Sequence, residues 1–160
     1  MELVHADLCG PMQTKTAGGN LYFFLLTHDY TRYSWVYFLQ SKDQMLECFK
    51  SFKILVEKQY GHSLKVLRTD RDGEFTSKDF RIFCEAQGIQ RQLTTFHTPE
   101  QNGVTERKNR TVVEMARCMM KEMNVPVDLW AETVATAVHI LNMSPTQALQ
   151  NCTPYQAPQV

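Results

Sequence analysis

The first forty residues carry hydrophobic patterns typical of β-strands. In residues 3–8 every second residue is apolar, which predicts a strand with one hydrophobic face. Residues 21–29 and 34–40 are rich in aromatic and β-branched residues, and the short polar turn between them predicts a hairpin. Three consecutive antiparallel strands are therefore expected at the start of the chain.

The middle of the chain alternates between helical and strand-like patterns. Apolar residues recur at helical spacing over residues 41–61, behind a capping-box pair formed by Ser41 and Gln44. Residues 63–70 predict a fourth strand, and residues 88–93 predict a short fifth strand after another helix. A strand–helix–strand connection of this length predicts that the fourth strand runs parallel to an earlier one.

The last third of the chain is predicted to be helical after a loop. Residues 94–103 combine Thr, Pro, Asn and Gly, which predicts an exposed loop. The loop is interpreted as a mobile gate, and the alternative is a plain connector. Amphipathic helices are expected over residues 104–123 and 126–144. The order βββαβαβαα predicts an α/β fold, with a five-stranded mixed sheet and helices on both faces.

The composition is that of an ordinary globular protein, with 43% hydrophobic and 21% charged residues among 160. We expect a single domain, with a core over residues 3–143 and a C-terminal exit segment over residues 144–160. Apolar runs fall short of the roughly 20 residues of a membrane helix, and polar residues interrupt the region where a signal peptide would be apolar. Five widely spaced cysteines argue against a disulfide framework or zinc cluster and favour reduced thiols inside a cell.

Three acidic residues occupy positions that suggest chemistry. Asp7 lies inside the first predicted strand, where a carboxylate is costly unless it is solvated, paired or bound to a metal. Asp70 ends the fourth strand, Glu106 lies just inside a helix, and thirty-five residues separate the two. If the first and fourth strands are neighbours, all three carboxylates can meet. The alternatives are an edge strand with Asp7 in water, and a competing acid, Asp29, whose expected role is to cap its own turn.

Carboxylates in such a cluster suit divalent metal chemistry. Mg²⁺ takes oxygen ligands, and two ions about 3.5–4 Å apart can clamp the attacking and leaving oxygens of a displacement at phosphorus. Three acids without a cysteine or histidine cluster fit that chemistry better than zinc. Because the acids repel one another, at least one is expected to have a raised pKa without metal.

The predicted helix around Glu106 is basic. Asn109 and Arg110 lie three and four residues beyond Glu106, on the same face, and further lysines and arginines follow. A basic helix beside a metal cluster would address a phosphodiester backbone. The alternative is the solvated face of an ordinary helix. The 17 basic and 17 acidic residues cancel, which excludes a uniformly basic surface and still permits a local basic stripe.

At these residues the chain resembles the catalytic core of a retroelement integrase of the copia type. The resemblance covers nearly the whole chain in order, and the 35-residue interval is that of the family. The matching motifs are LVHADLCGPM (3–12), DYTRYSWVYFL (29–39), LRTDRDGEF (67–75), FCEAQGI (83–89), TPEQNGVTERKNRT (98–111) and SPTQALQNCTPYQAP (144–158).

The resemblance implies a ribonuclease-H-like fold and a site made of Asp7, Asp70 and Glu106, which would bind two Mg²⁺ or Mn²⁺ ions. It implies that the enzyme trims the element's DNA 3′ ends and joins them to target DNA. It also implies a homodimer or higher multimer that acts in the nucleus, after a stage in a cytoplasmic virus-like particle. The predicted DNA contacts are Gln101, Asn102, Arg107, Lys108, Asn109 and Arg110.

Other functions stay open. A ribonuclease-H-type nuclease would use the same metals on an RNA–DNA hybrid, and a decayed core would serve as a DNA-binding or dimerisation module. Asp72-Gly73 stands where the family usually has Gly-Gly, which keeps the decayed core in view. A zinc hydrolase is disfavoured because the histidines are scattered. The absence of a zinc-binding region before Met1 and of a DNA-binding region after Val160 suggests one segment of a polyprotein.

Overall fold

The computed structural model describes residues 1–94 and 99–158, and for residues 99–103 the backbone alone. Five strands are present in the described residues: β1 (Leu3–Cys9), β2 (Tyr22–His28), β3 (Ser34–Leu39), β4 (Val66–Thr69) and β5 (Gln90–Leu93). The α-helices are α1 (Met45–Tyr60), α2 (Gly73–Thr76), α3 (Lys78–Ala86), α4 (Pro99–Glu122) and α5 (Trp130–Met143). Short 3₁₀ turns, Lys42–Gln44 and Val127–Leu129, precede α1 and α5.

The strands form one mixed sheet with β1 at its centre. Their order is β3-β2-β1-β4-β5. The pairs β1–β2 and β2–β3 are antiparallel, whereas β1–β4 and β4–β5 are parallel. The predicted mixed sheet is therefore confirmed, and β1 and β4 are neighbours, as convergence of the acids requires.

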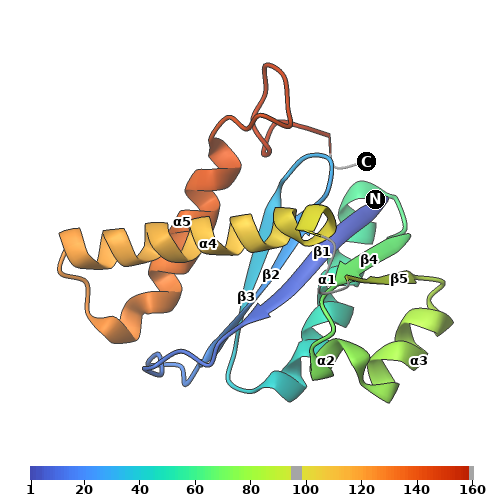
Figure 1. The fold of residues 1–160 in the computed structure, drawn as a ribbon, viewed down its shortest axis with the longest axis horizontal. Helices are drawn as coiled ribbons and strands as arrows, with labels where there is room; N and C mark the ends of the chain where they lie inside the picture. The colour runs from blue at the N-terminus through green and yellow to red at the C-terminus, as the bar shows by residue number, and fades with distance from the viewer. Residues whose placement is uncertain (95–98, 159–160) are drawn as a thin grey trace.

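Helices cover both faces of the sheet, and each face has its own hydrophobic core. Figure 1 shows α4 and α5 on one face and the three earlier helices on the other. Strand β2 serves both cores, because Phe24 packs with α1 and α3 while Phe23 packs with α4 and α5. Side chains alternate between the two faces of a strand, so a central strand covered on both sides must be apolar throughout. This arrangement explains the continuous hydrophobic run of β2.

Helix α4 begins earlier than its sequence pattern indicates. It starts at Pro99, so the predicted boundary at Val104 is wrong. Proline is tolerated in the first turn of a helix because its missing N–H would have no helical partner there. The expected gate over residues 94–103 therefore includes the first turn of α4, while residues 95–98 lie outside the described part of the chain.

Local capping agrees with the sequence at some helix ends only. Ser77 caps α3 by accepting a hydrogen bond from the Phe80 amide at 3.3 Å, and serine is a favoured residue at this position. The capping box at Ser41 is wrong: the side chain of Ser41 makes no cap, and Gln44 Oε1 instead accepts the amide of Gln40 at 2.9 Å. Gly61 ends α1 with a positive φ of 71°, a conformation that glycine adopts without steric cost.

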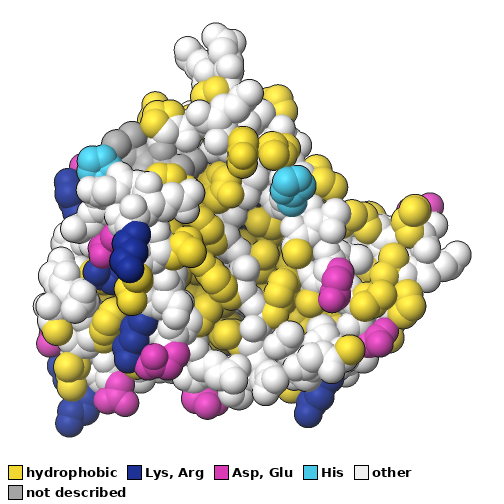
Figure 2. Space-filling model, turned by 180° about the vertical axis from the view of Figure 1, so that it is seen from behind, with side chains coloured by type: hydrophobic (Ala, Val, Ile, Leu, Met, Phe, Trp, Pro, Cys, Tyr) yellow, Lys and Arg dark blue, Asp and Glu magenta, His cyan; other side chains and the backbone are white. Residues whose placement is uncertain are grey.

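The surface opposite the view of Figure 1 is rich in apolar side chains. Figure 2 shows hydrophobic residues gathered across the middle of that face.

No helix in the described residues is long and apolar enough to span a bilayer. The five cysteines are all free thiols. Residues 144–158 contain turns that fold back on α5, with the Tyr155 amide donating to Asn142 O at 2.9 Å, and their treatment as an exit segment stays a prediction.

Candidate active site

Asp7 lies on the central strand β1, and Asp70 directly follows the neighbouring parallel strand β4. His5 pairs with Arg68 in the β1–β4 register, so residues two positions further along, Asp7 and Asp70, follow on the same side. Both are half-buried. The sheet order thus brings together two carboxylates that are far apart in sequence.

Glu106 reaches the same place from α4. It is exposed on the helix, and it lines with Asp7 and Asp70 a cavity of about 230 Å³. Among the described residues, no three Asp, Glu, His or Cys side chains are already close enough together to hold a metal ion. The structure therefore collects the three predicted acids around one cavity without bringing them into coordinating contact.

Both strand carboxylates resist ionisation. Burial raises the pKa of Asp7 to about 6, with a further contribution from the negative charge of Asp70. The pKa of Asp70 is also raised, chiefly by burial, while the Asp72 amide that donates to Asp70 Oδ1 at 3.1 Å opposes the shift. The expected rise in pKa is confirmed. Its leading cause is desolvation, and repulsion between the acids comes second.

Asn109 faces the acids. Its Nδ2 donates to Asp7 Oδ2, and the residue is only 9% exposed. Its Oδ1 is buried and has no hydrogen-bond partner within the described residues. The amide therefore orients the Asp7 carboxylate, and a contact between Asn109 and DNA stays a prediction.

The oxygen-rich set fits a hard divalent cation. Asp7, Asp70 and Glu106 offer carboxylates to one cavity. Asn109, whose Nδ2 contacts Asp7, carries a buried Oδ1 without a hydrogen-bond partner within the described residues. Buried acceptors without donors and carboxylates with raised pKa values are both stabilised by a nearby positive charge. Oxygen ligands of this kind suit Mg²⁺ or Mn²⁺.

Two of the predicted basic residues, Arg107 and Lys108, line a groove separate from the cavity of the acids. Arg107 and Lys108 line an open groove of about 330 Å³ together with Arg32, from the β2–β3 turn, and residues 146–148. Burial, and then the positive charge of Arg32, lower the pKa of Lys108 to about 8. Arg110 is exposed, and the side chains of Gln101 and Asn102 lie outside the described residues. Arg32 was not among the predicted contacts, since only the folded hairpin brings it to α4.

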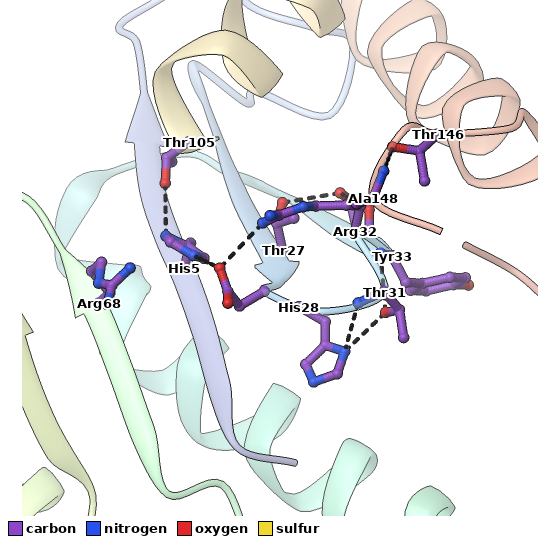
Figure 3. A network of polar contacts seen from close by, with 12 residues as sticks. His5, Thr27, His28, Thr31, Arg32, Tyr33, Arg68, Thr105, Thr146 and Ala148 are labelled. Atoms are coloured by element: carbon purple, nitrogen blue, oxygen red, sulfur yellow. Dashed lines mark hydrogen bonds and ion pairs between the residues drawn. The ribbon is translucent and has the colours of Figure 1, made fainter. Parts of the chain in front are cut away.

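His5 is a second residue that the sequence pattern did not single out. It is fully buried, and its Nε2 lies 2.7 Å from Asp29 Oδ1. Arg32 donates to the same carboxylate oxygen at 3.1 Å, and Thr105 Oγ1 lies 3.3 Å from His5 Nδ1 (Figure 3). Asp29 thus binds His5 and Arg32 and does not cap its own turn as expected. The sequence does contain one indication that His5 lies near the acids: it precedes Asp7 by two residues and therefore lies on the same face of the strand.

Comparisons with known proteins assign the chain to a family. The family model described as integrase core domain matches residues 1–99. The chain belongs to the integrase core domain family. It is 44% identical over 149 residues to a retrovirus-related Pol polyprotein from transposon TNT 1-94 of Nicotiana tabacum, covering 93% of this chain and 11% of that protein. It is 36% identical over 135 residues to the corresponding polyprotein from transposon RE2 of Arabidopsis thaliana, covering 84% and 9%.

Solved integrase cores share its fold. The catalytic core domain of BIV integrase aligns with a TM-score of 0.68 at 15% identity, over 96% of this chain and 91% of that one. The HTLV-2 integrase catalytic core, solved in complex with magnesium in a trimeric form, aligns with a TM-score of 0.68 at 16% identity, over 98% and 95%. The predicted ribonuclease-H-like fold and the resemblance to a copia-type integrase core are confirmed. This integrase core spans about a tenth of the length of its transposon relatives.

Proposed function

We propose that this integrase core is a metal-dependent polynucleotidyl transferase that trims the 3′ ends of element DNA and joins them to target DNA. The observation that carries the proposal is the convergence of Asp7, Asp70 and Glu106 on one cavity. Family membership supports DNA as the substrate. Water would be the nucleophile in trimming, and a DNA 3′-hydroxyl would be the nucleophile in joining.

In this proposal the three acids hold two Mg²⁺ or Mn²⁺ ions, which when bound supply positive charge to the reacting phosphate. The protein's own contribution is positioning. Asp7 projects from β1, and Asp70 follows the end of the paired strand β4. Asn109 orients Asp7, and the Asp72 amide orients Asp70. Such supporting hydrogen bonds fix the direction in which a carboxylate presents its oxygens.

DNA would contact the basic residues of α4. The groove containing Arg107, Lys108 and Arg32 can accept a phosphate, because Lys108 has no acidic partner within the described residues. Arg110 is exposed, and in this proposal it also contacts a DNA phosphate. Contacts by Gln101, Asn102 and Asn109 remain part of the proposal, as do a multimeric assembly, action in the nucleus and a preceding virus-like particle.

Replacing Glu106 with Gln tests the proposal. The variant Glu106→Gln is expected to lose Mn²⁺-dependent strand transfer, or its reversal on branched DNA, by at least about a hundredfold. The reason is that a lost ligand removes several kcal/mol of transition-state stabilisation. Glu114→Gln, an exposed acid on the same helix, is the matched control and should retain wild-type turnover.

The outcomes separate the competing functions. Unchanged turnover in Glu106→Gln would remove Glu106 from the site. Cleavage of an RNA–DNA hybrid without joining of DNA ends would favour a ribonuclease-H-type nuclease. Calorimetric titration that detects no Mg²⁺ or Mn²⁺ binding, even with DNA present, would favour a decayed core.

A further inference from the structure

His5 connects the central strand β1 to the helix that carries Glu106. Both ring nitrogens are engaged, with Nδ1 3.3 Å from Thr105 Oγ1 and Nε2 2.7 Å from Asp29 Oδ1. The ring is completely buried. Figure 3 shows the His5 ring below Thr105 and beside the carboxylate to which Arg32 also donates a hydrogen bond. A buried imidazole bonded at both nitrogens cannot turn without leaving a polar atom unpaired, so its orientation is fixed.

The partners of His5 determine the direction of these bonds. Asp29 also accepts a hydrogen bond from Arg32 at 3.1 Å, and a carboxylate beside a guanidinium stays ionised and only accepts. His5 Nε2 therefore carries the hydrogen toward Asp29. In the neutral ring, Nδ1 is then the acceptor, and the Thr105 hydroxyl donates to it. An ordered series of bonds thus extends from the β2–β3 turn to α4.

Strand and helix spacings match at this contact. His5 and Asp7 lie two residues apart on β1, about 6.6 Å along a strand. Thr105 and Asn109 lie four residues apart on α4, about 6 Å along a helix. Thr105 contacts His5, and Asn109 contacts Asp7. Two polar contacts one helical turn apart therefore connect α4 to β1.

Glu106 follows directly from this contact. Thr105 is buried against the sheet at 8% exposure, while the neighbouring Glu106 is exposed and lines the cavity of the acids. We propose that His5 is a positioning residue, which through Thr105 holds Glu106 at the cavity formed with Asp7 and Asp70. This inference rests on the proposed function for the role of Glu106, while the effect on α4 can be measured without activity.

Two substitutions of Thr105 separate the hydroxyl from the shape of the side chain. Thr105→Val keeps the shape and removes the donor, whereas Thr105→Ser keeps the donor and removes a methyl group. The 160-residue protein is compared by amide hydrogen exchange without metal or DNA, over residues 104–110 and over α5. Thr136→Val is the matched control, since Thr136 is an exposed helical threonine bonded to Glu132 O at 2.8 Å.

Thr105→Val is expected to exchange about fivefold faster than wild type over residues 104–110, as loss of one hydrogen bond predicts, with α5 unchanged. Thr105→Ser and Thr136→Val should stay near wild type. His5→Phe, which removes both bonds and keeps a ring, should accelerate exchange over the same residues at least as much. With Mn²⁺ and branched DNA, Thr105→Val should lower kcat about tenfold at unchanged KM for DNA, and Thr105→Ser should restore it.

Equal behaviour of Thr105→Val and Thr105→Ser would overturn the proposal, because packing and not the bond to His5 would then matter. Unchanged exchange over residues 104–110 in both Thr105→Val and His5→Phe would overturn it as well. Absence of turnover in the wild type would count against the proposed transferase instead, and the exchange comparison would still decide the role of His5.

Discussion

Asp7 is held in surroundings that disfavour its ionised form. Burial and the charge of Asp70 raise its pKa to about 6. A raised pKa in the folded state means that protonated Asp7 is favoured by folding, so its contribution is complete below the unfolded pKa and is lost as the pH rises through about 6. At neutral pH without metal, the ionised carboxylate therefore destabilises the fold.

The substitution Asp7→Asn tests this destabilisation. It removes the charge and keeps an oxygen for the amide of Asn109, so the metal-free protein should gain about 1–3 kcal/mol at pH 7.5 while losing strand transfer. Urea unfolding with a chelator at pH 7.5 and below pH 4 measures it, and the gain should vanish at the lower pH. Glu85→Gln, an exposed control, should change stability by less than about 0.5 kcal/mol. A destabilised Asp7→Asn at pH 7.5 would contradict the electrostatic account.

At the level of elements, Asn142 attaches α5 to the edge strand β3. Its Oδ1 accepts the Ser34 amide at 2.9 Å, and its Nδ2 donates to the Ser34 carbonyl at 2.8 Å. Ser34 is 2% exposed, so neither backbone group has water as a substitute. The Asn142 side chain thus makes the two backbone hydrogen bonds that a further strand would otherwise make to Ser34, the first residue of β3.

Removing this amide should weaken the whole fold. Asn142→Leu leaves two buried backbone groups unpaired and is expected to cost about 2–4 kcal/mol in urea unfolding. His139→Leu, at an exposed position of the same helix, should cost less than about 0.5 kcal/mol. A cost for Asn142→Leu no larger than that of the control would show that the α5–β3 contact is held by apolar packing alone.

On the scale of the whole molecule, the two helices that pack against the edge strand β3 carry exposed apolar residues. Strand β3 is an edge strand and packs with α1 through the Trp35–Phe52 ring contact and with α5 through the Phe38–Trp130 contact. The exposed apolar residues of these helices are Ile54 (55%), Leu55 (49%), Ile140 (40%) and Met143 (43%). Exposed edges and apolar patches favour association, and the balanced net charge does not oppose self-association.

A charge in this region should separate the predicted dimer. Ile54→Glu and Ile140→Glu are each expected to convert a dimer into a monomer in light scattering, because a carboxylate cannot be buried unpaired between two copies. Their midpoints of thermal unfolding, measured at low concentration, should be unchanged. Met123→Glu places the same charge on a 75% exposed residue that directly follows α4, outside α1 and α5, and should remain dimeric. A monomeric wild type would remove the predicted dimer.

Much of the architecture could be predicted from local pattern. The five strands and the main helices follow from hydrophobic periodicity, because each element buries one face or both. The acids were found because an ionised residue inside an apolar strand, such as Asp7, is costly without a compensating partner. The sequence pattern gave the wrong start for α4, because proline and glycine indicate a loop there although the chain is helical from Pro99.

By itself, then, the sequence indicated the fold class, the family and three candidate acids, since these depend on composition and spacing along the chain. Only the tertiary structure decided that Asp29 bonds His5. The same holds for the contacts of Thr105 with His5 and of Asn109 with Asp7, which join residues 100 and 102 positions apart. Local periodicity reports which face of an element is buried, and the partner that covers that face is selected only when the whole chain packs.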